Sequence, residues 1–269
     1  MAPPGMQVVR APPLPPPWRG EWRLRDGEQI VGTVKALVRP DNRCFIFFDS
    51  CRADAYQPLL AAAAESVDCD LYISVDEADS GKLASYLPLG LEVSRREGCY
   101  RVPTSPDETG LSDARLPAGL AVISAKDADE DRLRLLDDAL RQDVPGADGW
   151  RWGAAGFHEE TFSPAFDPAT YLVAVAPASG EYAGLLRVWN DPEGPLLGLI
   201  AALPTYRRRG LARALIAQAF AVLRDRGKTE VTAEIDDANV ASISLFTGLG
   251  ARRTGGSVEL IRRRVQGRR

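Results

Sequence analysis

Hydrophobic and polar residues alternate with a period of two in many short stretches of the chain, and this pattern predicts strands. The predicted strands cover residues 22–38, 44–49, 70–75, 99–103, 119–125, 171–176, 182–188, 195–203, 230–235, 251–253 and 258–264. Apolar residues at helical spacing predict helices over 55–65, 127–144, 210–227 and 239–248, with a further short helix inside 82–93. This order of strands and helices predicts a mixed α/β fold.

Two segments rich in turn-forming residues divide the chain. Residues 1–17 contain seven of the 20 prolines, so we expect 1–20 to form an extended, disordered arm. Turn and breaker residues crowd together over 103–117, where apolar periodicity is almost absent. The sequence therefore predicts one domain over 21–104 and a second over 118–269.

The composition is that of a soluble globular protein, with 45% hydrophobic residues, 26% charged residues and a net charge of −4. No apolar stretch is long enough to span a bilayer, and the first residues lack the order of a signal peptide. We therefore expect a cytoplasmic protein without membrane partners. The pI of about 5.3 argues against nucleic acid as a partner, so we interpret the arginines over 252–269 as a solvated face.

The four cysteines, Cys44, Cys51, Cys69 and Cys99, include no C-x-x-C pair, and His158 is the sole histidine. Neither a metal site nor a thiol redox motif has enough ligands at suitable spacing. We expect small buried thiols in a reducing compartment, and no metal.

The segment with the clearest chemistry follows the strand that ends at Leu203. An arginine-rich turn leads into a helix that begins at Gly210, and a helix start offers unpaired amides and a positive dipole end to an anion. The small residues Gly210 and Ala212 would let a ligand approach the backbone. Forked donors in the same segment suit a pyrophosphate, and they come from Arg207, Arg208, Arg209 and Arg213.

Residues 207–212, RRRGLA, resemble the R/Q-x-x-G-x-G/A acyl-CoA loop of the GNAT superfamily of N-acetyltransferases. Residues 239–250, NVASISLFTGLG, are similar to that family's N-x-x-A-x-x-L-Y-x-x-x-G segment. The resemblance implies a GNAT fold, acetyl-CoA as co-substrate and acyl-CoA-dependent N-acyl transfer.

The resemblance also implies a role for individual residues. The backbone of Ile200, Ala201 and Ala202 would pair with the pantetheine arm in a gap between two splayed strands. Asn239 would touch the cofactor near its thiol end, although an ordinary helix N-cap is an equally good interpretation. The pyrophosphate loop would consist of Arg207, Arg208, Arg209, Gly210, Leu211, Ala212 and Arg213.

Glu234 matches a position at which some family members place the general base. Its apolar neighbours suggest a half-buried carboxylate with a raised pKa, and the alternative is a solvent-facing strand position. Phe246 stands where the family usually has a tyrosine, so it cannot give a proton to the departing thiolate. Ser242 and Ser244 are possible substitutes, or simply polar positions on a short helix.

The acceptor side would be built by residues 148–168. Four aromatic residues could form a pocket wall or belong to the core, namely Trp150, Trp152, Phe157 and Phe162. His158, Glu159 and Glu160 could bind a cationic amine or lie on the surface.

Residues 70–103 parallel residues 230–263, with a strand, an acidic turn, a short helix and further strands in the same order. The first copy resembles a degenerate GNAT domain without the cofactor loop, so the chain would be a tandem pair in which the first copy does not bind acyl-CoA. Convergent α/β patterning is the alternative.

The leading hypothesis is acetyl transfer from acetyl-CoA to a primary amine of a small molecule, by direct attack in a ternary complex. Acetylation of protein N-termini or lysines is a second possibility. A non-catalytic CoA-binding regulatory protein is a third, suggested by Phe246. We expect a monomer or a homodimer.

Overall fold

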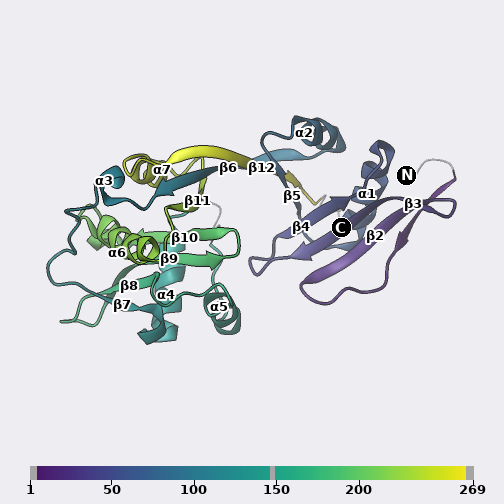
Figure 1. Ribbon diagram of the computed structural model, residues 1–269. Helices are drawn as coiled ribbons and strands as arrows, with labels where there is room; N and C mark the ends of the chain where they lie inside the picture. Colours follow the sequence, from purple (N-terminus) through teal and green to yellow (C-terminus); the bar gives the residue numbers. More distant parts are fainter. Residues whose placement is uncertain (1–4, 146–148, 265–269) are drawn as a thin grey trace. The chain divides into compact units, whose positions relative to one another are not determined.

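The computed structural model describes residues 5–145 and 149–264, which form two compact units (Figure 1). The first unit combines residues up to Arg96 with those from Gly256 onward, and the second covers Glu97–Gly255. The boundaries therefore differ from the predicted division at 104 and 118.

The first unit is a sheet with helices, in the order that the sequence predicts. Strands β1 to β4 form an antiparallel meander, β5 runs parallel to β4, and the second half of β12 closes the sheet against β5. Its elements are β1 (Met6–Arg10), β2 (Trp18–Asp26), β3 (Gln29–Val38), β4 (Cys44–Asp49), α1 (Tyr56–Ser66), β5 (Leu71–Asp76), α2 (Ser80–Tyr86) and β12 (Arg252–Arg262), with 3-10 turns at Ala53–Ala55 and Leu87–Leu89.

The predicted disordered arm is wrong for Met6–Arg10, which form β1 and pair with β2. Their alternating burial explains the pairing, because partly buried Met6 and Val8 pack against the core of the first unit. Residues 1–4 of the predicted arm lie outside the described residues.

The second unit has a sheet in the order β7-β8-β9-β10-β11-β6. Its elements are β6 (Glu92–Pro103), α3 (Pro106–Thr109), β7 (Ala121–Ser124), α4 (Glu130–Arg141), α5 (Ala154–Thr161), β8 (Tyr171–Val175), β9 (Tyr182–Asp191), β10 (Gly194–Ala202), α6 (Leu211–Asp225), β11 (Glu230–Asp236) and α7 (Val240–Thr247), with 3-10 turns at Ala125–Asp127 and Pro204–Tyr206. Helices α6 and α7 cover one face of this sheet, and α4 and α5 cover the other.

Each unit takes a strand from the other half of the chain. Residues Glu97–Pro103 of β6 pair with β11, and Ser257–Arg262 of β12 pair with β5. The two strands predicted over 251–253 and 258–264 are thus one strand, β12, which continues through Gly255 and Gly256. Pairing over a long sequence separation is invisible to local pattern analysis, which explains the misplaced boundaries.

The two halves share local geometry at a spacing of 160 residues. Asp79 and Asn239 cap α2 and α7, both with φ −84° and ψ 69°. Gly90 and Gly250 both lie in the left-handed region, with φ of 79° and 74°. In each half the strand before the long helix pairs in parallel with the next strand over two residue pairs. These correspondences support the tandem interpretation of the repeat.

Candidate cofactor site and acceptor face

A gap opens between β10 and β11. The two strands pair only at Leu196 with Thr232 and at Leu197 with Ala233, whereas β10 continues to pair with β9 as far as Ala202. The edge of β10 beyond Leu197 therefore has no strand partner on the β11 side.

The hydrogen-bond pattern of β10 shows which backbone groups face this gap. The amide of Leu203 donates to the carbonyl of Ala183 on β9 at 2.9 Å. Because hydrogen-bonded pairs alternate along an antiparallel ladder, Ala201 also pairs with β9, and Ile200 and Ala202 direct their amides and carbonyls into the gap. Of the three predicted pantetheine contacts, the backbone of Ile200 and the amide of Ala202 thus face the gap, whereas the Ala201 backbone is engaged by β9 and the Ala202 carbonyl accepts from Arg207.

The loop after β10 ends in an uncapped helix start. Gly210 is the N-cap residue of α6, has φ 85°, and provides no side-chain cap. Arg208, just before it, also lies in the left-handed region with φ 60°. The first-turn amides at Leu211, Ala212 and Arg213 therefore have no helical acceptor and form the positive end of the helix dipole. This geometry suits a phosphate.

Two of the four arginines in this segment have structural partners. Arg207 donates from Nε to the carbonyl of Ala202 at 2.9 Å and forms an ion pair with Asp143. Arg213 donates to the carbonyl of Gly110 at 2.6 Å and so fastens the segment after α3 to α6. Sequence analysis treated all four arginines alike, because partners this distant in sequence leave no local signal.

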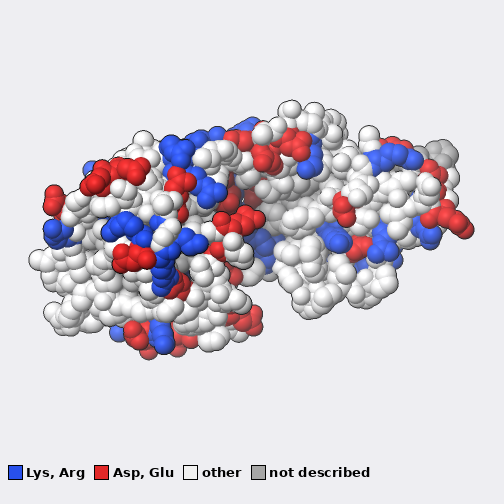
Figure 2. All heavy atoms as spheres, viewed as in Figure 1, with Lys and Arg blue, Asp and Glu red and all other residues white. Residues whose placement is uncertain are grey.

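Arg208 and Arg209 are exposed, and neither forms an ion pair within residues 5–145 and 149–264. The guanidinium of Arg209 lies 5.9 Å from the ring of Tyr206. The Tyr206 hydroxyl donates to Glu181 at 2.6 Å, and this hydrogen bond raises the pKa of Tyr206. Figure 2 shows basic and acidic side chains interspersed on the face in view.

Glu234 is exposed, so of the two alternatives the structure has the solvent-facing strand position and not the half-buried carboxylate. Its neighbours Ala233 and Ile235 enter the core beneath α6, and strand alternation turns Glu234 to the opposite face, which α4 and α5 share. Glu234 directly follows Ala233, the last residue of β11 that pairs with β10. The carboxylate therefore stands where the gap begins.

Asn239 and Phe246 both have structural roles. The Asn239 side chain accepts a hydrogen bond from the amide of Ser242 at 3.1 Å, as expected of an N-cap. The ring of Phe246 is 1% exposed and packs in the core with Leu249. Ser244 accepts a bond from the Gly248 amide through its carbonyl. A role of Asn239 or Phe246 toward a cofactor stays a prediction.

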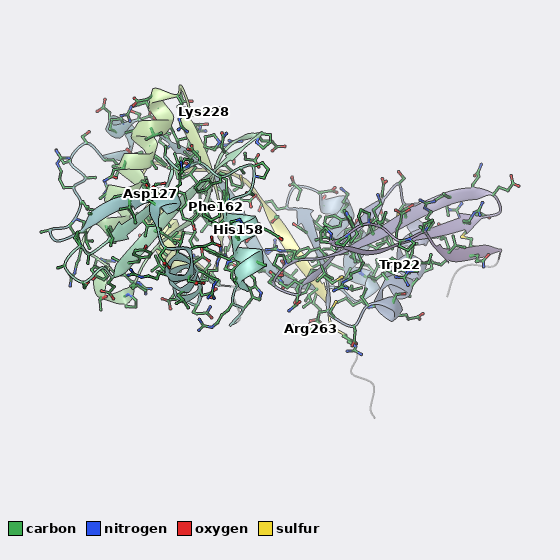
Figure 3. All side chains as sticks on the ribbon, turned by 90° about the horizontal axis from the view of Figure 1, so that it is seen from below. Trp22, Asp127, His158, Phe162, Lys228 and Arg263 are labelled. Atoms are coloured by element: carbon green, nitrogen blue, oxygen red, sulfur yellow. The ribbon has the colours of Figure 1, made fainter. Side chains whose placement is uncertain are left out.

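On the acceptor side, the aromatic residues divide between core and surface. Phe157 and Trp152 are buried, and Trp150 and Phe162 are partly exposed. His158 lies beside Phe162, with ring centroids 5.1 Å apart, and its Nδ1 is 3.1 Å from a carboxylate oxygen of Glu130 on α4 (Figure 3). The side chains of Glu159 and Glu160 are exposed.

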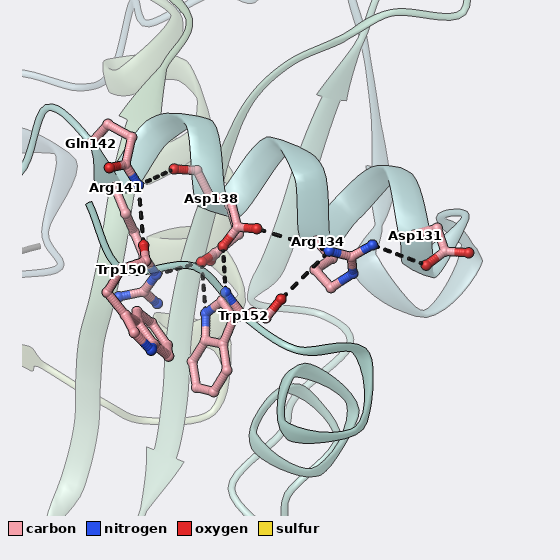
Figure 4. Close-up of polar contacts among 8 residues, drawn as sticks. Asp131, Arg134, Asp138, Arg141, Gln142, Trp150 and Trp152 are labelled. Atoms are coloured by element: carbon pink, nitrogen blue, oxygen red, sulfur yellow. Dashed lines mark hydrogen bonds and ion pairs between the residues drawn. The ribbon is translucent and has the colours of Figure 1, made fainter. Parts of the chain in front are cut away.

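Sequence analysis missed a network of buried charges between α4 and β9. Asp137 and Asp138 of α4 are 0% and 2% exposed, and Arg187 of β9 is 4% exposed. Asp138 accepts a hydrogen bond from the amide of Trp152 at 2.9 Å, beside further contacts of α4 (Figure 4). The sequence did contain a sign of this network. Asp137 occupies a position on the apolar stripe of α4, and Arg187 interrupts an apolar strand.

Burial shifts the pKa of two further groups, Tyr171 and Cys44. It raises the pKa of the Tyr171 phenol, which lies next to Arg187. It also raises the pKa of Cys44 to about 12, so this thiol is unreactive at neutral pH.

Within residues 5–145 and 149–264, no group of three His, Cys, Asp or Glu residues is arranged to hold a metal ion. No helix of the same segments combines the length and apolarity needed to cross a bilayer.

Comparison with known proteins matches residues 134–251 to the acetyltransferase (GNAT) family. A mycothiol acetyltransferase from Salinispora tropica is 32% identical over 174 residues, which are 62% of this chain and 55% of that protein. One from Propionibacterium freudenreichii is 26% identical over 236 residues, covering 85% and 73%. The match thus spans about half the length of the first of these relatives.

Two solved structures share the fold. A GCN5-related N-acetyltransferase from Sphaerobacter thermophilus has a TM-score of 0.68 at 14% identity, covering 92% of this chain and 82% of that one. A tandem GNAT protein from the clavulanic acid biosynthesis pathway has a TM-score of 0.65 at 18% identity, covering 99% and 86%. With the splayed strands and the uncapped loop of the second unit, these matches show that the chain has the GNAT fold, and residues 134–251 within it match the acetyltransferase (GNAT) family.

Proposed function

We propose that the protein transfers an acetyl group from acetyl-CoA to a primary amine of a small molecule. The observation that supports this most strongly is the juxtaposition of the β10 edge and the start of α6. The β10 edge offers the backbone of Ile200 and the amide of Ala202, and the helix start offers uncapped amides beside Arg208 and Arg209. An extended amide-bearing chain that ends in a pyrophosphate fits this pair of features. The curated relatives, named mycothiol acetyltransferases, also support a small-molecule acceptor.

In this proposal each group of the chain has a defined task. The loop amides and the two free arginines hold the pyrophosphate, and the backbone of β10 aligns the pantetheine arm. Bound acetyl-CoA supplies the thioester that the amine attacks. The Ile200 amide, which faces the gap, donates to the thioester carbonyl as negative charge develops there. Glu234 takes the proton from the amine, directly or through water. Because Phe246 carries no proton, water protonates the thiolate.

The cofactor site can be tested by calorimetric titration of acetyl-CoA. We expect one binding event per chain in the parent protein. Arg208→Ala combined with Arg209→Ala should weaken binding about 10- to 100-fold, because two charge-assisted contacts to phosphate are lost. Arg263→Ala, an exposed arginine on the other unit, is the matched control and should bind like the parent. Failure of the parent to bind acetyl-CoA would refute the proposal.

Turnover is tested separately, by chromatographic measurement of CoA released in the presence of a panel of small amines. Chromatography avoids thiol reagents, which would also modify the protein's four cysteines. Binding of acetyl-CoA without amine-dependent release would favour the non-catalytic alternative.

A further inference from the structure

A buried ion pair joins α4 to β9 outside the candidate cofactor loop. The Arg187 guanidinium lies 3.4 Å from an Asp137 carboxylate oxygen, and both side chains are almost fully buried. Asp137 also accepts from the indole nitrogen of Trp152 at 3.1 Å and from Nε of Arg141. The carboxylate is therefore well satisfied by three donors.

Arg187 is less well satisfied. Its Nε is buried and has no hydrogen-bond partner among the residues that the structure describes. Burying a charge costs several kcal/mol in free energy, and replacing a buried ion pair by apolar residues is often neutral or stabilising. Stability alone is therefore a poor reason for an arginine at this position.

The guanidinium lies over an irregularity in β10. The register between β9 and β10 shifts between Leu197 and Leu199, which makes Gly198 a bulge. A Cβ atom on Gly198 would stand 2.7 Å from the indole nitrogen of Trp189 and 3.2 Å from Nε of Arg187. The guanidinium in turn stacks 4.8 Å from the Trp189 ring centroid. Arg187 and Trp189 thus cover the bulge from the α4 side.

The bulge decides which groups of β10 face the gap. It lies immediately after the last pair with β11, and the backbone of Ile200 and Ala202 points into the gap only in the register that follows it. A slip of one residue would exchange the groups that face β9 with those that face the gap. Whatever holds the bulge therefore holds the direction of the Ile200 amide.

We infer that Arg187, anchored by Asp137, is a positioning residue that keeps the β10 bulge in register and so aims the Ile200 amide at the thioester carbonyl. This inference rests on the proposed function, because the carbonyl belongs to the proposed acetyl donor. Arg187 acts through the β10 bulge and touches no reacting atom itself.

The test compares Arg187→Met with the double variant Arg187→Met, Asp137→Leu. In the single variant, kcat should fall about 10- to 100-fold, as expected when an oxyanion-type donor is misaligned, while the Kd of acetyl-CoA changes less than about threefold. Asp137→Leu also removes the acceptor of Trp152 and Arg141, so the double variant should be no more stable than the single variant and its kcat should stay low. If either variant has the parent kcat at a temperature at which it is fully folded, the pair only stabilises the fold and the inference is overturned.

Amide hydrogen exchange on the same proteins tests the register without activity. The Ile200 amide should exchange quickly in the parent, since it faces the gap, and become protected in Arg187→Met if β10 slips. An unchanged exchange pattern with unchanged kcat refutes the inference alone. A parent that neither binds acetyl-CoA nor releases CoA refutes the proposed function, and the exchange result then still reports whether Arg187 holds the register.

Discussion

At the residue scale, neighbouring residues of the same type have different tasks because their tertiary partners differ. Arg207 and Arg213 bind backbone carbonyls, which leaves Arg208 and Arg209 to meet an anion. The motif alone assigned all of them to the cofactor. A side chain that is already held by a structural partner contributes little to ligand binding. We therefore expect only the exposed Arg208 and Arg209 to control the affinity for acetyl-CoA.

Glu234→Gln is expected to lower kcat about 10²- to 10⁴-fold, because the amide cannot accept the amine proton. The affinity for acetyl-CoA should stay unchanged, since Glu234 lies on β11 and is not part of the loop at 207–213 that would hold the pyrophosphate. Glu230→Gln, on the same strand and paired with Arg252, is the matched control. Steady-state CoA release at several pH values provides the measurement, and equal kcat in parent and Glu234→Gln would exclude Glu234 as the base.

Asp167 offers a pH-dependent test of stability. Burial alone would raise its pKa, but hydrogen bonds from Arg226 and from the Ala169 amide outweigh burial and lower the pKa. A lowered folded-state pKa stabilises the protein above the ordinary pKa near 4, and this contribution is lost as the pH falls through the lowered value.

Arg226→Gln should therefore reduce the free energy of unfolding by about 0.5–1 kcal/mol at pH 7, a modest value because the guanidinium is 46% exposed. The difference from the parent should shrink as the pH falls below the ordinary carboxyl pKa of about 4 and vanish below the lowered folded-state value. Urea unfolding of both proteins at pH 7 and pH 3 measures the difference in their free energies of unfolding. An equal difference at both pH values would contradict the ion-pair explanation.

At the element scale, the sheets depend on strands that come from the distant half of the chain. The inward side of β12 buries Val258 and Leu260 completely in the core of the first unit. Leu260→Ala should therefore cost about 2–5 kcal/mol in the stability of that unit, through lost burial and a cavity.

The change is best measured with two probes, amide hydrogen exchange of β5 for the first unit and acetyl-CoA binding for the second. The amides of β5 are a suitable probe because this strand pairs directly with the part of β12 that carries Leu260. A variant with parent-like unfolding of the first unit would contradict the pairing of β12 with β5.

At the scale of the whole molecule, the strand exchange makes the halves interdependent. A fragment of residues 118–269 lacks β6, the partner of β11, and a fragment of residues 21–104 lacks β12. We expect each fragment to be insoluble or unfolded alone, and their co-expression to restore a folded complex. Circular dichroism and size-exclusion chromatography of the two fragments would show this, and two independently folded fragments would contradict it.

The whole chain should bind one acetyl-CoA rather than two. In the first unit the segment before α1 carries Asp49 and Asp54, and Arg52 is engaged by Asp54 and Asp26. Carboxylates at a helix start repel phosphate, so we expect the first unit to offer no second anion site. The calorimetric stoichiometry checks this, and a value near two would show that the first copy retains a site.

The sequence alone determined the mixed α/β fold, most elements and the arginine-rich turn at the start of α6, because each is encoded locally. Apolar periodicity sets strands and helices, and RRRGLA places small and basic residues at a helix start in consecutive positions. Tertiary structure decided what depends on contacts between distant residues. These are the exchange of β6 and β12, the exposure of Glu234, the engagement of Arg207, and the buried pair of Arg187 and Asp137. Strand pairing and charge burial are properties of three-dimensional neighbours, and no local pattern specifies those neighbours.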